Sequence, residues 1–217
     1  MIPSEHSFIH IQIDVLLTGF IEDFTSRALI PLTRNLGIMQ VEQTGMLSNL
    51  RDQSTYRTFP EDDLDEILTA IETVPDDIIE SSTHGHELRA LDDSIADSLQ
   101  EYAYEHKVDH GRNPACKLWS DDGFDHSVDL YHPDKRIAIE IEKSERKRVS
   151  DDILKFIKGG KTQRRGRKKI EFGCLIVPIN YRGNGNIFAA TMNTLAFMRS
   201  IMFVEYVAVL GYRDPRW

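Results

Sequence analysis

Cysteine is scarce in this sequence of 217 residues, which contains only Cys116 and Cys174 and has no Cys-x-x-Cys pair. This scarcity argues against a disulfide-stabilised scaffold and against a cysteine zinc site, and it is compatible with a reducing cytoplasm. The sequence also lacks an apolar run of about 18 residues, the length that a membrane span needs. Its N-terminus has no basic region followed by an apolar stretch. We therefore expect a cytoplasmic protein with neither a membrane span nor a secretory signal.

What is present is the composition of a soluble globular protein, with 41% hydrophobic and 28% charged residues. The length fits one domain, or one core with an appended subdomain, and can bury a sizeable interior. No internal repeat or low-complexity tract interrupts it.

Charge is distributed unevenly along the chain, whose net charge is −9. Twelve Lys or Arg residues and three acidic residues lie between Lys143 and Lys169, so this segment carries +9 and the remainder −18. A compact basic band on an acidic body favours a polyanionic partner such as a nucleic acid, although such bands are often only solvated surface. The candidate nucleic-acid contacts are Lys143, Arg146, Lys147, Arg148, Lys155, Lys158, Lys161, Arg164, Arg165, Arg167, Lys168 and Lys169.

Residues 128–143 predict two short strands joined by a turn, with turn chemistry in the His-Pro-Asp-Lys segment at 132–135. Because side chains alternate along a strand, Glu140 and Glu142 share one face while isoleucines occupy the other. Asp129 on the partner strand can bring a third carboxylate to the same edge. Converging carboxylates repel one another unless a cation lies among them, and hard oxygen ligands suit Mg²⁺ or Mn²⁺. The alternative is a solvated strand face that pairs with neighbouring basic residues.

Periodicity and turn signals predict the remaining elements. We expect helices over 14–33, 61–73, 76–80, 87–108, 149–158 and 186–202, strands over 115–119, 170–178 and 203–210, a loop over 45–60 and a linker over 81–86. From Glu87 onward the expected order is helix, three strands, helix, strand, helix, strand.

This order, with one carboxylate on the second strand and an acidic pair on the third, resembles the PD-(D/E)xK nuclease superfamily. More narrowly, it is similar to restriction endonucleases of the BamHI and BglII type. The likeness covers roughly residues 87–212 and is carried by Asp129, the segment 136–142 with its Glu-x-Glu pair, the helix 149–158, the strand 172–179 and the segment 203–211. It implies an α/β fold: an αβββαβ core at 87–217, with a mixed central sheet flanked by helices, and an N-terminal helical extension at 1–86.

The resemblance also implies a site and its chemistry. Asp129 and Glu140 are the expected metal ligands, the carbonyl of Ile141 adds an oxygen, and Glu142 is a ligand or the general base for the attacking water. The lysine that the superfamily usually has at the third position is not at 142, and Lys143 lies one residue later, so Glu142 and Lys143 compete for that role. Glu101 or Glu105 on the preceding helix adds an outer carboxylate, and Glu105 is counted among the expected metal ligands. The alternative is that both are charges on the helix surface.

The function implied is a Mg²⁺-dependent endonuclease that hydrolyses phosphodiester bonds in double-stranded DNA, as a type II restriction enzyme does, with Mn²⁺ as a substitute for Mg²⁺. A homodimer is expected because a two-fold protein matches a palindromic site, through either the N-terminal helices or the helix at 186–202. Two alternatives stay open: another nuclease of the same superfamily, for repair or for a mobile element, and a non-catalytic nucleic-acid-binding protein with the same fold.

Overall fold

The structure of this protein is a computed structural model. It describes residues 39–48, 57–80, 89–107, 113–121, 124–143, 146–161, 163–164, 167–182 and 185–217. The helix expected over 14–33 and the linker expected over 81–86 lie outside the described residues.

A six-stranded mixed sheet forms the centre of the fold. Its strands, in spatial order, are β1 (Val41–Ser48), β10 (Tyr206–Tyr212), β9 (Phe172–Pro178), β6 (Ile137–Ile141), β5 (Leu130–His132) and β2 (Glu105–His106). β10, β9 and β6 run parallel, while β1, β5 and β2 are antiparallel to their neighbours. The expected mixed sheet is confirmed.

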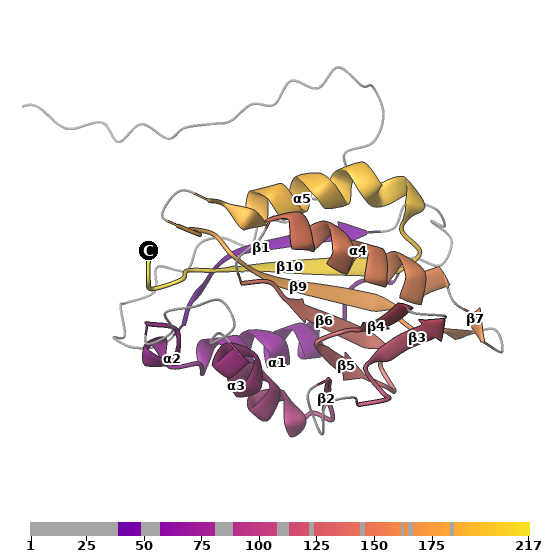
Figure 1. Ribbon diagram of the computed structural model, residues 1–217, viewed down its shortest axis with the longest axis horizontal. Coiled ribbons are helices and arrows are strands. Elements are labelled where there is room, and N and C mark those ends of the chain that lie inside the picture. The colour runs from indigo at the N-terminus through magenta and orange to yellow at the C-terminus, as the bar shows by residue number, and fades with distance from the viewer. Residues whose placement is uncertain are drawn as a thin grey trace, which may run out of the picture.

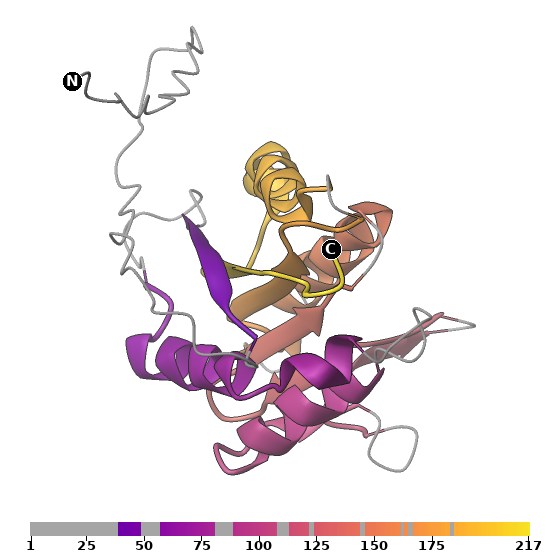
Figure 2. The ribbon, with the colours of Figure 1, turned by 90° about the vertical axis from the view of Figure 1, so that its left-hand side faces the viewer.

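Helices cover both faces of this sheet (Figures 1 and 2). One face carries α1 (Glu61–Glu72), α2 (Asp76–Glu80) and α3 (Arg89–Gln100), and the other carries α4 (Arg146–Lys161) and α5 (Ile187–Met198), which continues as the 3-10 turn Arg199–Ile201. Two small hairpins complete the described part: β3 (Lys117–Asp121) with β4 (Phe124–Ser127), and β7 (Gln163–Arg164) with β8 (Arg167–Lys168). Of the helices that the structure describes, none is long and apolar enough to cross a membrane.

The alternation of the central strands divides the interior into two cores. On β6, Ile137, Ile139 and Ile141 enter the core beneath α1 to α3, while Ala138 enters the core beneath α4 and α5. β9 is buried along its whole length, as expected for a central parallel strand that has helices on both faces. Glu140 follows the alternation of Ala138 and therefore faces the α4 layer.

Two expected elements are wrong. The loop expected from Gly45 to Pro60 begins too early, because β1 extends to Ser48 and pairs along the edge of β10. The helix expected over 87–108 ends at Gln100, and the chain then turns at Ala103, whose φ of 65° is incompatible with a continuing right-handed helix. The backbone after that turn forms β2.

The domain boundary expected at residue 86 stays a prediction. The strand β1 lies on the N-terminal side of that boundary, yet it is hydrogen-bonded to β10 in the same sheet as the rest of the core.

Candidate active site

The two strands of the hairpin bring their carboxylates together as the sequence predicted. Asp129 lies immediately before β5 and is almost completely buried. Its Oδ2 accepts a hydrogen bond of 2.7 Å from the backbone N–H of Ile141 at the end of β6. Its Oδ1 accepts from the ammonium of Lys107. Both oxygens of Asp129 therefore accept hydrogen bonds, one from the end of β6 and the other from the residue that follows β2.

The charge of Lys107 decides the ionisation of Asp129. Burial would raise the pKa of Asp129, but the ammonium of Lys107 and the N–H of Ile141 outweigh it, so the pKa lies below its ordinary value. A carboxylate that is hydrogen-bonded in its charged form stays ionised at neutral pH.

Glu140 has one engaged oxygen and one that has no hydrogen-bond partner. Its side chain is 2% exposed, and Oε2 accepts a hydrogen bond of 2.8 Å from Lys155 Nζ on α4. Oε1 is buried without a partner. Burial, and then the negative charges of Asp129 and Asp152, raise the pKa of Glu140 well above its ordinary value, while Lys155 opposes that rise. A further cation beside Oε1 would favour the charged form.

Asp152 and Lys155 come from the inward face of α4. They form an i,i+3 pair, with Lys155 Nζ 2.9 Å from Asp152 Oδ1. Burial raises the pKa of Asp152, although its pairing with Lys155 opposes the rise. Lys155 was expected to contact DNA, but its ammonium instead bridges two carboxylates of the cluster.

The structure adds Asp92 of α3, which the sequence reasoning missed. Its Oδ2 accepts from the ammonium of Lys143, and its Oδ1 is buried without a hydrogen-bond partner. Burial is the main cause that raises the pKa of Asp92 to about 7; Lys143 opposes the rise and Asp129 adds to it. A signal for Asp92 existed, because it lies between Leu91 and Ile95 on the buried face of an amphipathic helix.

The third-position candidates Glu142 and Lys143 differ in their surroundings. Glu142 is buried, and its backbone N–H donates to the carbonyl of Ile176 at 2.9 Å, so the strand pairing continues past β6. Its Oε1 accepts from the backbone N–H of Lys143 at 2.9 Å. The side chain of Lys143 turns to Asp92 on the α3 side of the sheet.

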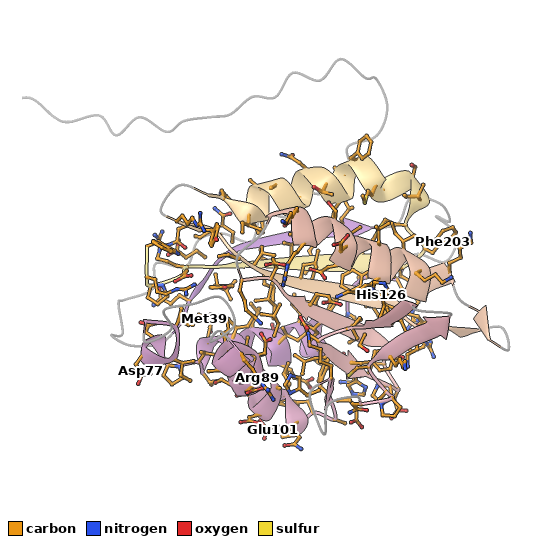
Figure 3. All side chains as sticks on the ribbon, in the orientation of Figure 1. Met39, Asp77, Arg89, Glu101, His126 and Phe203 are labelled. Atoms are coloured by element: carbon orange, nitrogen blue, oxygen red, sulfur yellow. The ribbon has the colours of Figure 1, made fainter. Side chains whose placement is uncertain are left out.

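Glu101 and Glu105 are not side by side on a helix. Glu105 lies on β2 opposite Tyr131 of β5, and its Oε2 accepts a hydrogen bond of 2.8 Å from Asn113 Nδ2. Glu101 is exposed beyond the end of α3, at the outer edge of the molecule (Figure 3). The placement expected for this pair on one continuous helix is therefore wrong, because the helix stops at Gln100.

The predicted basic band divides into exposed and partly buried members. Lys147 and Arg148 in the first turn of α4 are exposed, as are Lys158 and Lys161 further along it. Lys169 instead donates to the carbonyl of Ala115 at 2.8 Å and lies 4.1 Å from the ring centroid of Tyr131. Arg165, and the side chains of Arg146, Arg164, Arg167 and Lys168, lie outside the described part of the chain.

The carboxylates of this cluster are partnered by ammonium groups. Lys107 pairs with Asp129, Lys143 with Asp92, and Lys155 with Glu140 and Asp152. Among the described residues, no group of three or more His, Cys, Asp or Glu side chains is arranged to hold a metal ion. The ligand chemistry nevertheless fits a hard divalent cation. Among the described residues of this cluster, Asp92 Oδ1 and Glu140 Oε1 are buried carboxylate oxygens without a hydrogen-bond partner.

Comparison with known proteins gives a family and a likeness to a solved structure. The sequence profile of a family described as "Putative halobacteria restriction endonuclease" matches residues 39–212. The crystal structure of the restriction endonuclease BglII complexed with a DNA 16-mer is similar with a TM-score of 0.48 and 10% sequence identity. That likeness covers 78% of this chain and 77% of the BglII chain. No curated protein matches the sequence.

The family match begins before β1 and ends with the last residue of β10, so it includes the whole six-stranded sheet and the carboxylate cluster. It covers far more than half of the sequence. This chain therefore belongs to the family that carries the description "Putative halobacteria restriction endonuclease".

Proposed function

We propose that this chain is a Mg²⁺-dependent type II endonuclease that hydrolyses phosphodiester bonds in double-stranded DNA. The observation that carries the proposal is the pairing of Asp129 with the end of β6, which brings it beside Glu140 in a buried acidic cluster. Exposed basic residues begin α4 only a few positions later in the chain. An acidic centre next to a cationic surface is what metal-assisted cleavage of a polyanion requires.

Asp129 and Glu140 would hold the divalent ion, together with the carbonyl oxygen of Ile141. A bound Mg²⁺ lowers the pKa of a water molecule and stabilises charge on the phosphate oxygens. Glu142 serves as a further ligand or as the base that takes the proton from the attacking water. Lys143 remains the other candidate for the third position. Mn²⁺ accepts the same oxygen ligands and should replace Mg²⁺.

DNA would lie against the start of α4. Basic residues in the first turn of a helix are electrostatically unfavourable, because the helix N-terminus already carries partial positive charge. Lys147 and Arg148 are nevertheless exposed there. These positive charges would attract a phosphate backbone alongside this turn, and each contact makes binding salt-dependent.

We further propose that the enzyme acts as a homodimer on a palindromic site, as a cytoplasmic restriction enzyme would. The large apolar side chains exposed near the end of α5 support this. Phe197 is 86% exposed and Ile201 is 44% exposed, and a second copy that packs against this helix would bury both side chains. They lie on the helix at 186–202, one of the two interface candidates expected from the sequence.

Plasmid cleavage tests the proposal. Purified protein incubated with plasmid DNA should give discrete bands with Mg²⁺ and leave the plasmid intact with EDTA. Smeared products would instead indicate a nonspecific nuclease of the same superfamily. A gel shift without cutting, under all metal conditions, would indicate a non-catalytic binding protein and would overturn the proposed activity.

A further inference from the structure

A lysine from outside the hairpin holds the central carboxylate of the cluster. Helix α4 packs on the sheet face opposite α3 (Figures 1 and 2) and is anchored by Val149, Ile153 and Phe156, which are buried in the core on that side. This anchoring carries Lys155 inward until its side chain is only 17% exposed. Its ammonium then lies 2.8 Å from Glu140 Oε2 and 2.9 Å from Asp152 Oδ1.

This contact distinguishes the two oxygens of Glu140. Oε2 is fixed by the ammonium, and Oε1 is buried without a hydrogen-bond partner. A buried acceptor without a partner is costly in a folded protein, so such atoms are often found where a ligand or ion completes the site. With Oε2 fixed, the carboxylate group cannot rotate to exchange its oxygens without breaking the ion pair.

We propose that Lys155 is a positioning residue of this nuclease, which holds Glu140 by Oε2 so that Oε1 is presented to the divalent cation. This inference rests on the proposed function, because it assigns a role within the same site. Lys155 acts through Glu140, in the way that groups surrounding a metal site orient the ligands themselves. Asp152 fixes the ammonium from its own helix and completes the arrangement.

The other two lysines of the cluster make different contacts. Lys107 donates to Asp129, whose second oxygen already accepts from Ile141. Lys143 donates to Asp92 on α3. Of the hydrogen bonds among the described residues, the one that holds the Glu140 side chain comes from Lys155. The residue was hidden in the sequence because it lies 15 positions after Glu140, within the basic band.

The first experiment compares Lys155→Met and Lys155→Arg with the control Asp151→Asn, which alters an exposed charge on the same helix. Mn²⁺ affinity of the DNA-free protein is measured by electron paramagnetic resonance, and cleavage under single-turnover conditions with Mg²⁺. Lys155→Met should lower the Mn²⁺ affinity and the cleavage rate each by roughly 10- to 100-fold, the usual effect of losing a group that orients a metal ligand. Lys155→Arg keeps a cation and should recover part of the loss, and Asp151→Asn should match the wild type.

DNA affinity in Ca²⁺, measured by gel shift, separates positioning from DNA contact. Lys155→Met should leave DNA affinity close to that of the wild type. If the variant instead loses DNA affinity while its Mn²⁺ affinity is unchanged, Lys155 is a DNA contact and the proposal is wrong. A lower melting temperature with unchanged Mn²⁺ affinity and cleavage would likewise reduce the ion pair to a purely structural role.

A double-mutant cycle keeps the test decisive if Lys155→Met folds poorly. In the Glu140→Gln background, Lys155→Arg should change Mn²⁺ affinity much less than it does in the wild type, because the two residues act as a unit. Additive losses would overturn the proposal. A wild-type protein that neither binds Mn²⁺ nor cuts DNA would overturn the proposed function itself. If the wild type cuts DNA and Lys155→Met cuts it equally well, only this inference is overturned.

Discussion

Asp129 Oδ2 and the backbone N–H of Ile141 are joined by a buried hydrogen bond of 2.7 Å. The bond ties the residue that precedes β5 to the last residue of β6, and it thereby sets where Asp129 lies relative to Glu140. Because the other oxygen of Asp129 accepts from Lys107, the carboxylate has both a structural and an electrostatic function.

Replacement of Asp129 should separate these functions. Asp129→Ala leaves a buried N–H and a partly buried ammonium without their acceptor, and breaking such a pair costs about 3 kcal/mol. Asp129→Asn also removes the charge that pairs with Lys107, but it keeps an acceptor oxygen for Ile141 and should therefore lose less stability than Asp129→Ala. Both variants should fail to cut DNA, because the charge is gone. Urea unfolding and plasmid cleavage measure the two effects, and equal stability losses in the two variants would contradict the assignment.

Glu140→Ala should abolish Mg²⁺-dependent cleavage while it leaves DNA binding largely intact. The physical reason is that Glu140 is almost fully buried and lies at the centre of the cluster, whereas the basic surface proposed for DNA is on the outside of α4. Cleavage assays with Mg²⁺ and gel shifts in Ca²⁺ provide the readouts. Glu72→Ala, which removes an exposed glutamate of α1, is the matched control. Undiminished cleavage by Glu140→Ala would remove it from the active site.

The pH dependence of stability should report the titration of Asp92. Burial is the main cause that raises its pKa from 3.8 to about 7 in the folded protein. The folded state therefore binds the proton more tightly than the unfolded state does, and the contribution of Asp92 to stability is lost as pH rises from about 4 towards 7. An asparagine at this position does not titrate, so the stability of Asp92→Asn should not show this loss.

Unfolding in urea at several pH values measures this effect. The stability of Asp92→Asn relative to the wild type should increase between pH 4 and pH 7 and then level off. A difference that is constant across this range would mean that Asp92 ionises normally in the folded protein.

Phe197→Glu should shift a dimer towards monomer. If a second copy buries Phe197, the carboxylate that replaces the ring would lose its hydration without gaining a partner. This cost opposes association. Sedimentation velocity at several protein concentrations gives the monomer fraction. Gln100→Glu, which adds a charge at an exposed position of the opposite layer, should leave the association unchanged. A dimer that tolerates Phe197→Glu must use another surface.

Lys147→Ala and Arg148→Ala should weaken DNA binding through the loss of phosphate contacts. Each lost contact should reduce the slope of log affinity against log salt by about 0.9. Fluorescence anisotropy with a duplex at several salt concentrations, in Ca²⁺, measures this slope. Arg89→Ala on α3 serves as the control, since Arg89 is also exposed. Unchanged slopes in the α4 variants would place the DNA elsewhere.

Local patterns were sufficient to predict the hairpin and the central strands. The alternation of isoleucines around Glu140 and the continuous apolar run of β9 are properties of a few adjacent residues, and both agree with the structure. The helices α1 and α2 likewise begin at the acidic positions predicted for them. These elements follow from local periodicity, which can be recognised in a short stretch of the sequence.

Residues whose role depends on distant contacts were misjudged. β1 contains Gly45 and several polar residues, so it lacks the composition of a strand, and its pairing with β10 is what makes it one. A Cβ at Gly45 would lie 2.6 Å from the sulfur of Met192 on α5, so a larger residue there would force the end of that side chain to move. Lys155 looked like one more member of the basic band, since only the packing of α4 shows that it points inward.

The position of β1 at the edge of the sheet has a consequence for any shortened form of the protein. In the full chain, β10 is an interior strand because β1 covers its outer edge from Val41 to Ser48. A chain that began at residue 87 would leave the backbone N–H and C=O groups of β10 uncovered along an apolar strand. Such open edges recruit other strands, so the truncated protein should self-associate rather than fold as an independent nuclease domain.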